Sequence, residues 1–332
     1  MNRLLLIICF QLIFRAICVS HELPEALKML DGMPITYCSQ GAETYAIHLQ
    51  KLLNTAIHYF DTATNESVDV ELIVLNKGDA SSMNVQWPMP FSTDNPNRIF
   101  MPNQGYIEVQ LGDHLKSENQ FHISDFIAIH ELGHILWHKR LGWHEGQPRF
   151  KNHKWIGEFI ADYYMMGYLI EVMGVNAFPE SSGSMFTYLP FRYKTLIDFE
   201  LQYSKLPKTN YVGFQAKFSE LAFTVFNDKG WSFVSELDQL YDSLANKEGL
   251  DRRASFPVVN DHIASISADS ADWFKGLKNT PHPILMFMGL FGMITISIIG
   301  LRKTASIYKL IIVLILSAGL SGLLIFSVFY LI

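Results

Sequence analysis

Cysteine is scarce in this chain of 332 residues, which contains three. Cys9 and Cys18 lie within the first 20 residues, so only Cys38 remains beyond them. A chain that loses those residues cannot form an internal disulfide, and an ordinary apolar core must then stabilise it. We expect Cys38 to be a small buried side chain rather than a nucleophile.

Charge is also sparse, since charged residues make up 17% of the chain and the net charge is -6. No dense basic stripe accompanies this balance, so the electrostatic footprint of a nucleic-acid-binding protein is missing and we expect no such partner. Internal repeats and low-complexity tracts are absent as well. The hydrophobic fraction of 49% exceeds what a soluble globular domain needs, which indicates that part of the chain lies in lipid.

The N-terminal apolar run has the form of a secretory signal. Asn2 and Arg3 precede apolar residues 4–14, and residues 18–20 offer a site for signal peptidase. We therefore interpret residues 1–20 as a signal peptide. Arg15 interrupts the apolar run early, so an uncleaved signal anchor is the alternative, and both interpretations predict export of the region that follows.

Two uncharged apolar runs, 284–301 and 310–332, lie near the C-terminus. Each is long enough to cross the hydrocarbon core as a helix, and together they predict a transmembrane hairpin in contact with membrane lipid. The loop 302–309 between them carries three basic residues and no acidic residue, which places it on the cytoplasmic side. We therefore expect a multi-pass membrane protein whose central region is extracytoplasmic, in the periplasm, a lumen or the extracellular space.

The central region mixes helix and strand signals before it becomes mainly helical. Apolar residues at helical spacing predict helices, whereas strict alternation and β-branched residues predict strands. The expected elements are a helix over 42–62, a strand over 68–75 with a turn at 76–78, a proline-rich loop over 80–103, a strand over 106–111, a helix over 125–141 capped by Ser124 and stopped by Gly142, a helix over 154–173 stopped by Gly174, and mainly helical chain over 195–277 with breaks near Pro207, Gly230 and Pro257. This order predicts an α+β region over 21–180 followed by a helical subdomain over 181–280.

The helix expected at 125–141 contains a sequence typical of a metal-binding helix, His130-Glu131-Leu132-Gly133-His134. His130 and His134 are about one turn apart on one face, so their imidazoles can bind one metal ion together. Glu131 is turned about 100° around the helix axis and can instead act as a base on a water molecule at that ion. Zinc suits this chemistry because it polarises a carbonyl group and lowers the pKa of water.

A catalytic zinc site needs a third protein ligand and an open coordination position. Glu158 lies on the next expected helix, and Asp162 follows it four residues later on the same face. One carboxylate can therefore bind the metal while the other accepts a hydrogen bond from a ligand histidine. We expect Glu158 to be the ligand, with His138, His144 and His153 as the alternatives.

The two helical motifs resemble those of the thermolysin-like metallopeptidases, the gluzincins, in which a His-Glu-x-x-His helix is followed by a helix with Glu-x-x-x-Asp. The resemblance covers these two helices only. It implies a zincin-like catalytic domain in which His130, His134 and Glu158 bind Zn²⁺, Glu131 is the general base and acid, and Asp162 supports a ligand histidine. By the same resemblance, strand 106–111 is the edge strand that pairs with an extended polypeptide substrate. No motif identifies the tyrosine or histidine that this family uses to stabilise the oxyanion.

The sequence thus favours a membrane-anchored zinc metalloendopeptidase that hydrolyses peptide bonds of extracytoplasmic polypeptides. The metzincin pattern is excluded, because it needs glycine and histidine where this chain has Trp137 and Arg140. An intramembrane protease is disfavoured, because polar residues at both ends of the motif helix leave too short an apolar run. The remaining alternative is a non-catalytic, membrane-tethered zincin-like module that binds or regulates a partner.

Overall fold

The computed structural model describes residues 23, 26–83, 90–103, 123–142, 153–175, 195–245 and 252–278. The chain forms two compact units that divide between Pro148 and Arg149, ahead of the boundary expected between residues 180 and 181. In the described ranges, no helix is both long and apolar enough to cross a membrane. The expected signal peptide, the strand at 106–111 and the two C-terminal apolar runs lie outside these ranges.

The described part of the first unit is built on a five-stranded sheet in the order β1-β2-β3-β5-β4. The strands are β1 (Lys28–Leu30), β2 (Ile35–Cys38), β3 (Glu71–Leu75), β4 (Phe91–Thr93) and β5 (Arg98–Pro102). The neighbours β2, β3 and β5 run parallel, while β1 and β4 pair antiparallel at the two ends of the order. Helix α2 (Glu43–Thr64) connects β2 with β3, which is the crossover that parallel neighbours require.

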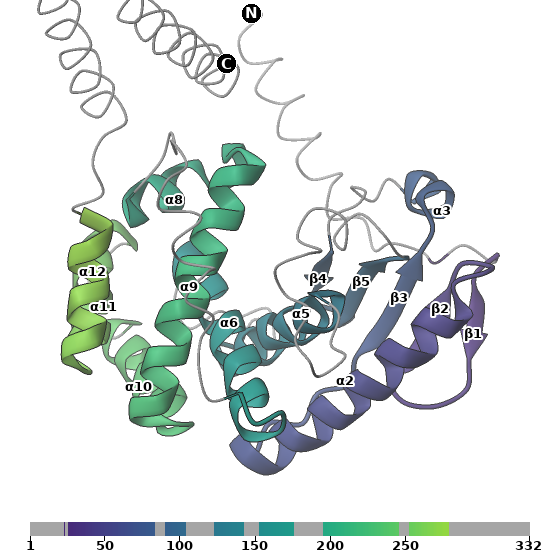
Figure 1. Ribbon diagram of the computed structural model, residues 1–332, viewed down its shortest axis with the longest axis horizontal. Helices are drawn as coiled ribbons and strands as arrows, with labels where there is room; N and C mark the ends of the chain where they lie inside the picture. The colour runs from purple at the N-terminus through teal and green to yellow at the C-terminus, as the bar shows by residue number, and fades with distance from the viewer. Residues whose placement is uncertain are drawn as a thin grey trace, which may run out of the picture. The chain divides into compact units, whose positions relative to one another are not determined.

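The sheet is apolar on both faces. Helices α2 and α5 (Ile123–Arg140) lie side by side against it (Figure 1). Because strand side chains alternate, the buried residues Leu72 and Val74 face these helices, whereas Ile73 and Leu75 join a separate apolar cluster on the opposite face. The buried members of that cluster are Leu27, Ile73, Leu75, Ala80, Met83 and Phe100. Cys38 is fully buried, as expected.

The described residues within 80–103 do not form the loop that the sequence predicts. Helix α3 (Lys77–Ser82) begins at the expected turn, and β4 and β5 follow it within residues 91–102. Pro96 lies in the turn between these two strands and Pro102 ends β5, so neither proline removes a hydrogen bond from the middle of a strand. The prediction is wrong because prolines that flank strands have the same local pattern as prolines of irregular chain.

The helices expected before, at and after the metal motif are confirmed as α2, α5 and α6 (Lys154–Glu171). Gly142 and Gly174 follow α5 and α6 with φ angles of 74° and 70°, the left-handed conformation that ends helices. Ser124 is not the N-cap, because α5 already begins at Ile123. Its buried hydroxyl has no hydrogen-bond partner in the part of the chain that the structure describes.

The second unit contains only helices as regular elements within its described residues, and α6 is buried along most of its length. The remaining helices are α8 (Leu196–Gln202), the short 3-10 helix η3 (Tyr203–Lys205), α9 (Lys208–Lys229), α10 (Ser232–Ala245), α11 (Arg252–Ala264) and α12 (Ala268–Lys278). Helix α6 packs against α8 and α9, and α9 packs against α10 and α12. A helix that is covered on all sides must satisfy its own polar residues, which in α6 include Glu158 and Asp162.

Two of the three predicted breaks in the second unit are confirmed. Pro207 immediately precedes α9 and Gly230 follows it, whereas Pro257 lies inside α11. Proline in a helix interior costs about 3 kcal/mol relative to alanine. Val259 and Ile263 on α11 are fully buried, and their packing offsets this local penalty.

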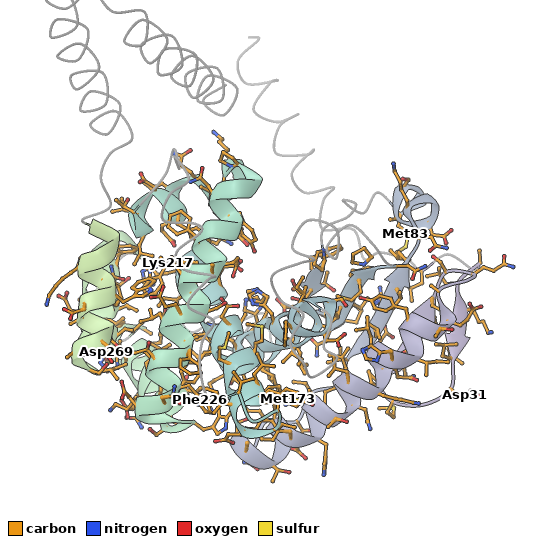
Figure 2. All side chains as sticks on the ribbon, in the orientation of Figure 1. Asp31, Met83, Met173, Lys217, Phe226 and Asp269 are labelled. Carbon is orange, nitrogen blue, oxygen red and sulfur yellow. The ribbon has the colours of Figure 1, made fainter. Side chains whose placement is uncertain are left out.

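Gly167 is a position of close approach on α6. A Cβ atom there would lie 2.4 Å from the ring of Trp231 and 2.5 Å from that of Phe226, which Figure 2 labels on α9. Such overlap forces the rings apart, so we predict that Gly167→Ala destabilises the protein by about 2 kcal/mol. Gly276→Ala on α12, where a Cβ would meet nothing within 4 Å, should be neutral or stabilising by up to about 1 kcal/mol. Urea unfolding compares the variants, and equal stability would contradict this packing.

Candidate metal centre

Helix α5 is held within the first unit at both ends. His48 of α2 donates a hydrogen bond of 3.0 Å to the fully buried carboxylate of Asp125, in the first turn of α5. Arg140, the last residue of α5, pairs with Glu66 just beyond α2. Because a buried carboxylate without a partner is costly, these contacts fix the position of the motif helix.

His130 and His134 lie together on α5, as their spacing predicts. Their ring centroids are 4.7 Å apart and the ring planes are nearly perpendicular, at 89°. His130 is buried and His134 is partly exposed. Two imidazoles this close can each give a nitrogen to one metal ion.

Glu131, which lies between His130 and His134 in the sequence, has its own hydrogen-bond partner. Its Oε2 accepts a hydrogen bond of 2.9 Å from the hydroxyl of Ser92 on β4. The residue is 8% exposed, and among the described residues Ser92 is the only hydrogen-bond partner of its carboxylate. One carboxylate oxygen is therefore fixed, and the other can accept a proton from a water molecule.

His138 continues the same helix face but is engaged by an acid. Its Nδ1 donates a hydrogen bond of 2.8 Å to Asp94, which follows β4, and its ring centroid is 6.1 Å from that of His134. His138 is not one of the residues whose ligand atoms gather in a possible metal site. This contact gives His138 a structural partner of its own.

The carboxylate of Glu158 on α6 is 3% exposed and is surrounded by donors. Tyr203 of η3 donates to Oε1, whereas Tyr211 and Gln215 of α9 donate to Oε2, the tyrosine over 2.9 Å. Three donors compensate for the loss of water around a buried carboxylate. They also hold the side chain in one orientation.

Asp162 lies one turn further along α6 and is also buried, with 2% exposure. Its Oδ2 accepts a hydrogen bond of 3.0 Å from Ser219 of α9. This contact fixes one carboxylate oxygen in the second unit. The expected hydrogen bond from a ligand histidine to Asp162 stays a prediction.

His153, another alternative ligand, has a different environment. It is fully buried immediately before α6, where its Nδ1 lies 3.1 Å from the hydroxyl of Tyr241 and its Nε2 lies 3.1 Å from that of Ser255. Burial raises the pKa of Tyr241 above its usual value, so the phenol stays protonated and can donate. Both ring nitrogens of His153 thus have protein partners. The third alternative, His144, lies outside the described residues.

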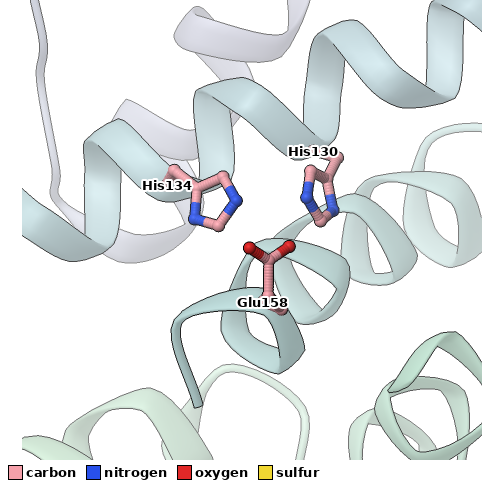
Figure 3. Close-up of side chains that lie close together, drawn as sticks. All are labelled: His130, His134 and Glu158. Atoms are coloured by element: carbon pink, nitrogen blue, oxygen red, sulfur yellow. The ribbon is translucent and has the colours of Figure 1, made fainter. Parts of the chain in front are cut away.

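Figure 3 shows His130, His134 and Glu158 close together, and one ligand atom from each lies within 4.8 Å of those of the others. No other group of three or more His, Cys, Asp or Glu residues in the described part of the chain meets this criterion. Two imidazoles and one carboxylate suit a divalent metal ion.

The sequence did not identify the residues that surround these candidate ligands. For Ser92, a signal was present, because Asn95-Pro96 is a turn dipeptide between two β-prone runs. Tyr203 and Gln215 are 45 and 57 residues from Glu158, and no local sequence pattern predicts such contacts.

No protein-family model matches the chain, and no curated protein or solved structure is significantly similar to it.

Proposed function

We propose that this chain is a zinc metalloendopeptidase that hydrolyses peptide bonds of extracytoplasmic polypeptides. The observation that carries the proposal is the combination of two imidazoles and one carboxylate within 4.8 Å of one another with a glutamate that follows the first histidine. A purely structural metal site needs no such base beside its ligands. The resemblance to gluzincins rests on the same residues.

The donor set fits zinc better than calcium or magnesium, because those two ions favour oxygen ligands. His130, His134 and Glu158 would hold the ion as three protein ligands. The ion would polarise the scissile carbonyl group and lower the pKa of water. This chemistry cleaves an amide without a covalent intermediate on the protein.

The residues of the chain would supply the proton transfers and the orientation of the ligands. Glu131 would accept a proton from the attacking water and deliver it to the leaving amine. Asp162 would accept a hydrogen bond from a ligand histidine and fix its tautomer. Tyr211 and Gln215 donate to Oε2 of Glu158. Its Oε1 would bind the metal once the hydroxyl of Tyr203 moves away from it.

The membrane attachment is proposed from the apolar runs 284–301 and 310–332. Helix α12 ends at Lys278, shortly before the first of these runs in the sequence. A hairpin there would keep the active site near the membrane and limit its substrates to polypeptides within reach. Membrane lipid would then be a permanent partner of the chain.

Metal removal from the full-length protein in detergent tests the proposal. Elemental analysis should find about one zinc per chain in folded protein. Cleavage of an unstructured polypeptide such as casein should stop when a chelator is added and return with Zn²⁺. Folded protein without metal would refute the assignment of His130 and His134. Zinc-loaded protein that cleaves no polypeptide would favour the non-catalytic binding or regulatory module.

A further inference from the structure

Ser92 and Asp94 lie on one side of β4 and its continuation. Phe91 stacks on Phe100 of β5, with ring centroids 4.6 Å apart, and belongs to the apolar cluster on the face away from α5. Since successive side chains of a strand point to opposite faces, Ser92 points toward α5. Thr93 points the other way, and its hydroxyl bonds the carbonyl oxygen of Pro96.

Helix α5 presents matching acceptor and donor groups on one stripe. Glu131 and His138 are seven residues apart, which is about two helical turns, so they lie on the same side of the helix. Ser92 donates to Glu131, and Asp94 accepts from His138. Two side-chain pairs therefore align β4 with the segment of α5 that carries the histidine pair.

We propose that Ser92 is a positioning residue for the proton transfers of Glu131, an inference that rests on the proposed peptidase function. The serine hydroxyl must donate, because an ionised carboxylate only accepts. It holds Oε2, while Oε1 has no hydrogen bond within the described chain. The carboxylate cannot then rotate freely, and its second oxygen remains directed for the exchange of a proton with water.

The kinetic test removes and restores this hydroxyl. Ser92→Ala should lower kcat about tenfold with KM changed less than about twofold, because the hydrogen bond orients a group that acts in the chemical step. Ser92→Thr, which restores a hydroxyl, should recover most of the lost activity. Thr93→Val removes the neighbouring hydroxyl, which points to the other face, and should leave kcat unchanged.

Asp94→Ala separates positioning from simple docking of β4. It removes the second pair between β4 and α5 and should lower Tm, but it should reduce kcat much less than Ser92→Ala does. An equal loss of kcat in both variants would show that Ser92 acts only by docking the strand. Wild-type kcat in Ser92→Ala, or no recovery in Ser92→Thr, would also overturn the proposal.

A stability measurement on metal-free protein tests the same pair without reference to activity. Ser92→Ala should lower Tm by about 2–4 °C in the wild-type background. It should lower Tm by clearly less in a Glu131→Ala background, because the carboxylate that Ser92 contacts is already absent there. Additive effects would overturn the proposed bond. A wild-type protein that binds zinc but cleaves nothing would refute the peptidase function, whereas normal kcat in Ser92→Ala beside an inactive Glu131→Gln would refute only the role of Ser92.

Discussion

Replacing Glu131 with glutamine is expected to lower peptide-bond cleavage by roughly 10³-fold while the zinc content of the protein stays the same. The amide keeps the size of the side chain and can still accept a hydrogen bond from Ser92. It cannot take a proton from water or return one to the leaving amine. Elemental analysis and cleavage rates of the same preparation measure both quantities.

Glu66→Gln is the matched control for this change. Glu66 is also a buried glutamate of the first unit, but its partner is Arg140 at the end of α5. The variant should lose stability and keep kcat within about threefold of wild type. Full cleavage by Glu131→Gln would contradict the general-base role, and a binding or regulatory function that survives in this variant would favour the non-catalytic alternative.

Replacing Glu158 with glutamine is expected to weaken zinc binding by at least about a hundredfold. The change removes the negative charge of the third proposed ligand. Tyr203 and Tyr211 donate to different carboxylate oxygens, so only one of them can keep its hydrogen bond to the single amide oxygen. Competition with a chromophoric chelator measures the affinity. Activity should fall in parallel at limiting zinc and recover in part when zinc is added in excess.

The alternative ligands His138, His144 and His153 provide the controls. His153→Gln should lower Tm, because it disrupts the buried contacts with Tyr241 and Ser255, but it should leave zinc affinity unchanged. His138→Ala should likewise retain zinc, since His138 is engaged by Asp94. Normal zinc binding in Glu158→Gln, together with a loss in either histidine variant or in His144→Ala, would assign the third ligand to that histidine.

Local sequence patterns do not distinguish the strands of the first unit from loops. Ile99 and Met101 form the buried middle of β5, yet the prolines around them favoured an irregular segment. The stabilisation that an apolar residue gives to a strand depends on the neighbouring strands against which it packs. Similarly, Pro257 was expected to break a helix, and the burial of Val259 and Ile263 keeps α11 continuous.

Local sequence patterns predict the features that depend on neighbours within one helix. The spacing of His130 and His134 brings their rings together on α5, and Gly142 ends that helix, because helix periodicity and left-handed glycine are local properties. The folded arrangement is needed to show that Ser92 holds Glu131 and that three donors from η3 and α9 surround Glu158. Such partners meet because distant segments bury their apolar faces together, and no short pattern encodes which polar groups then come into contact.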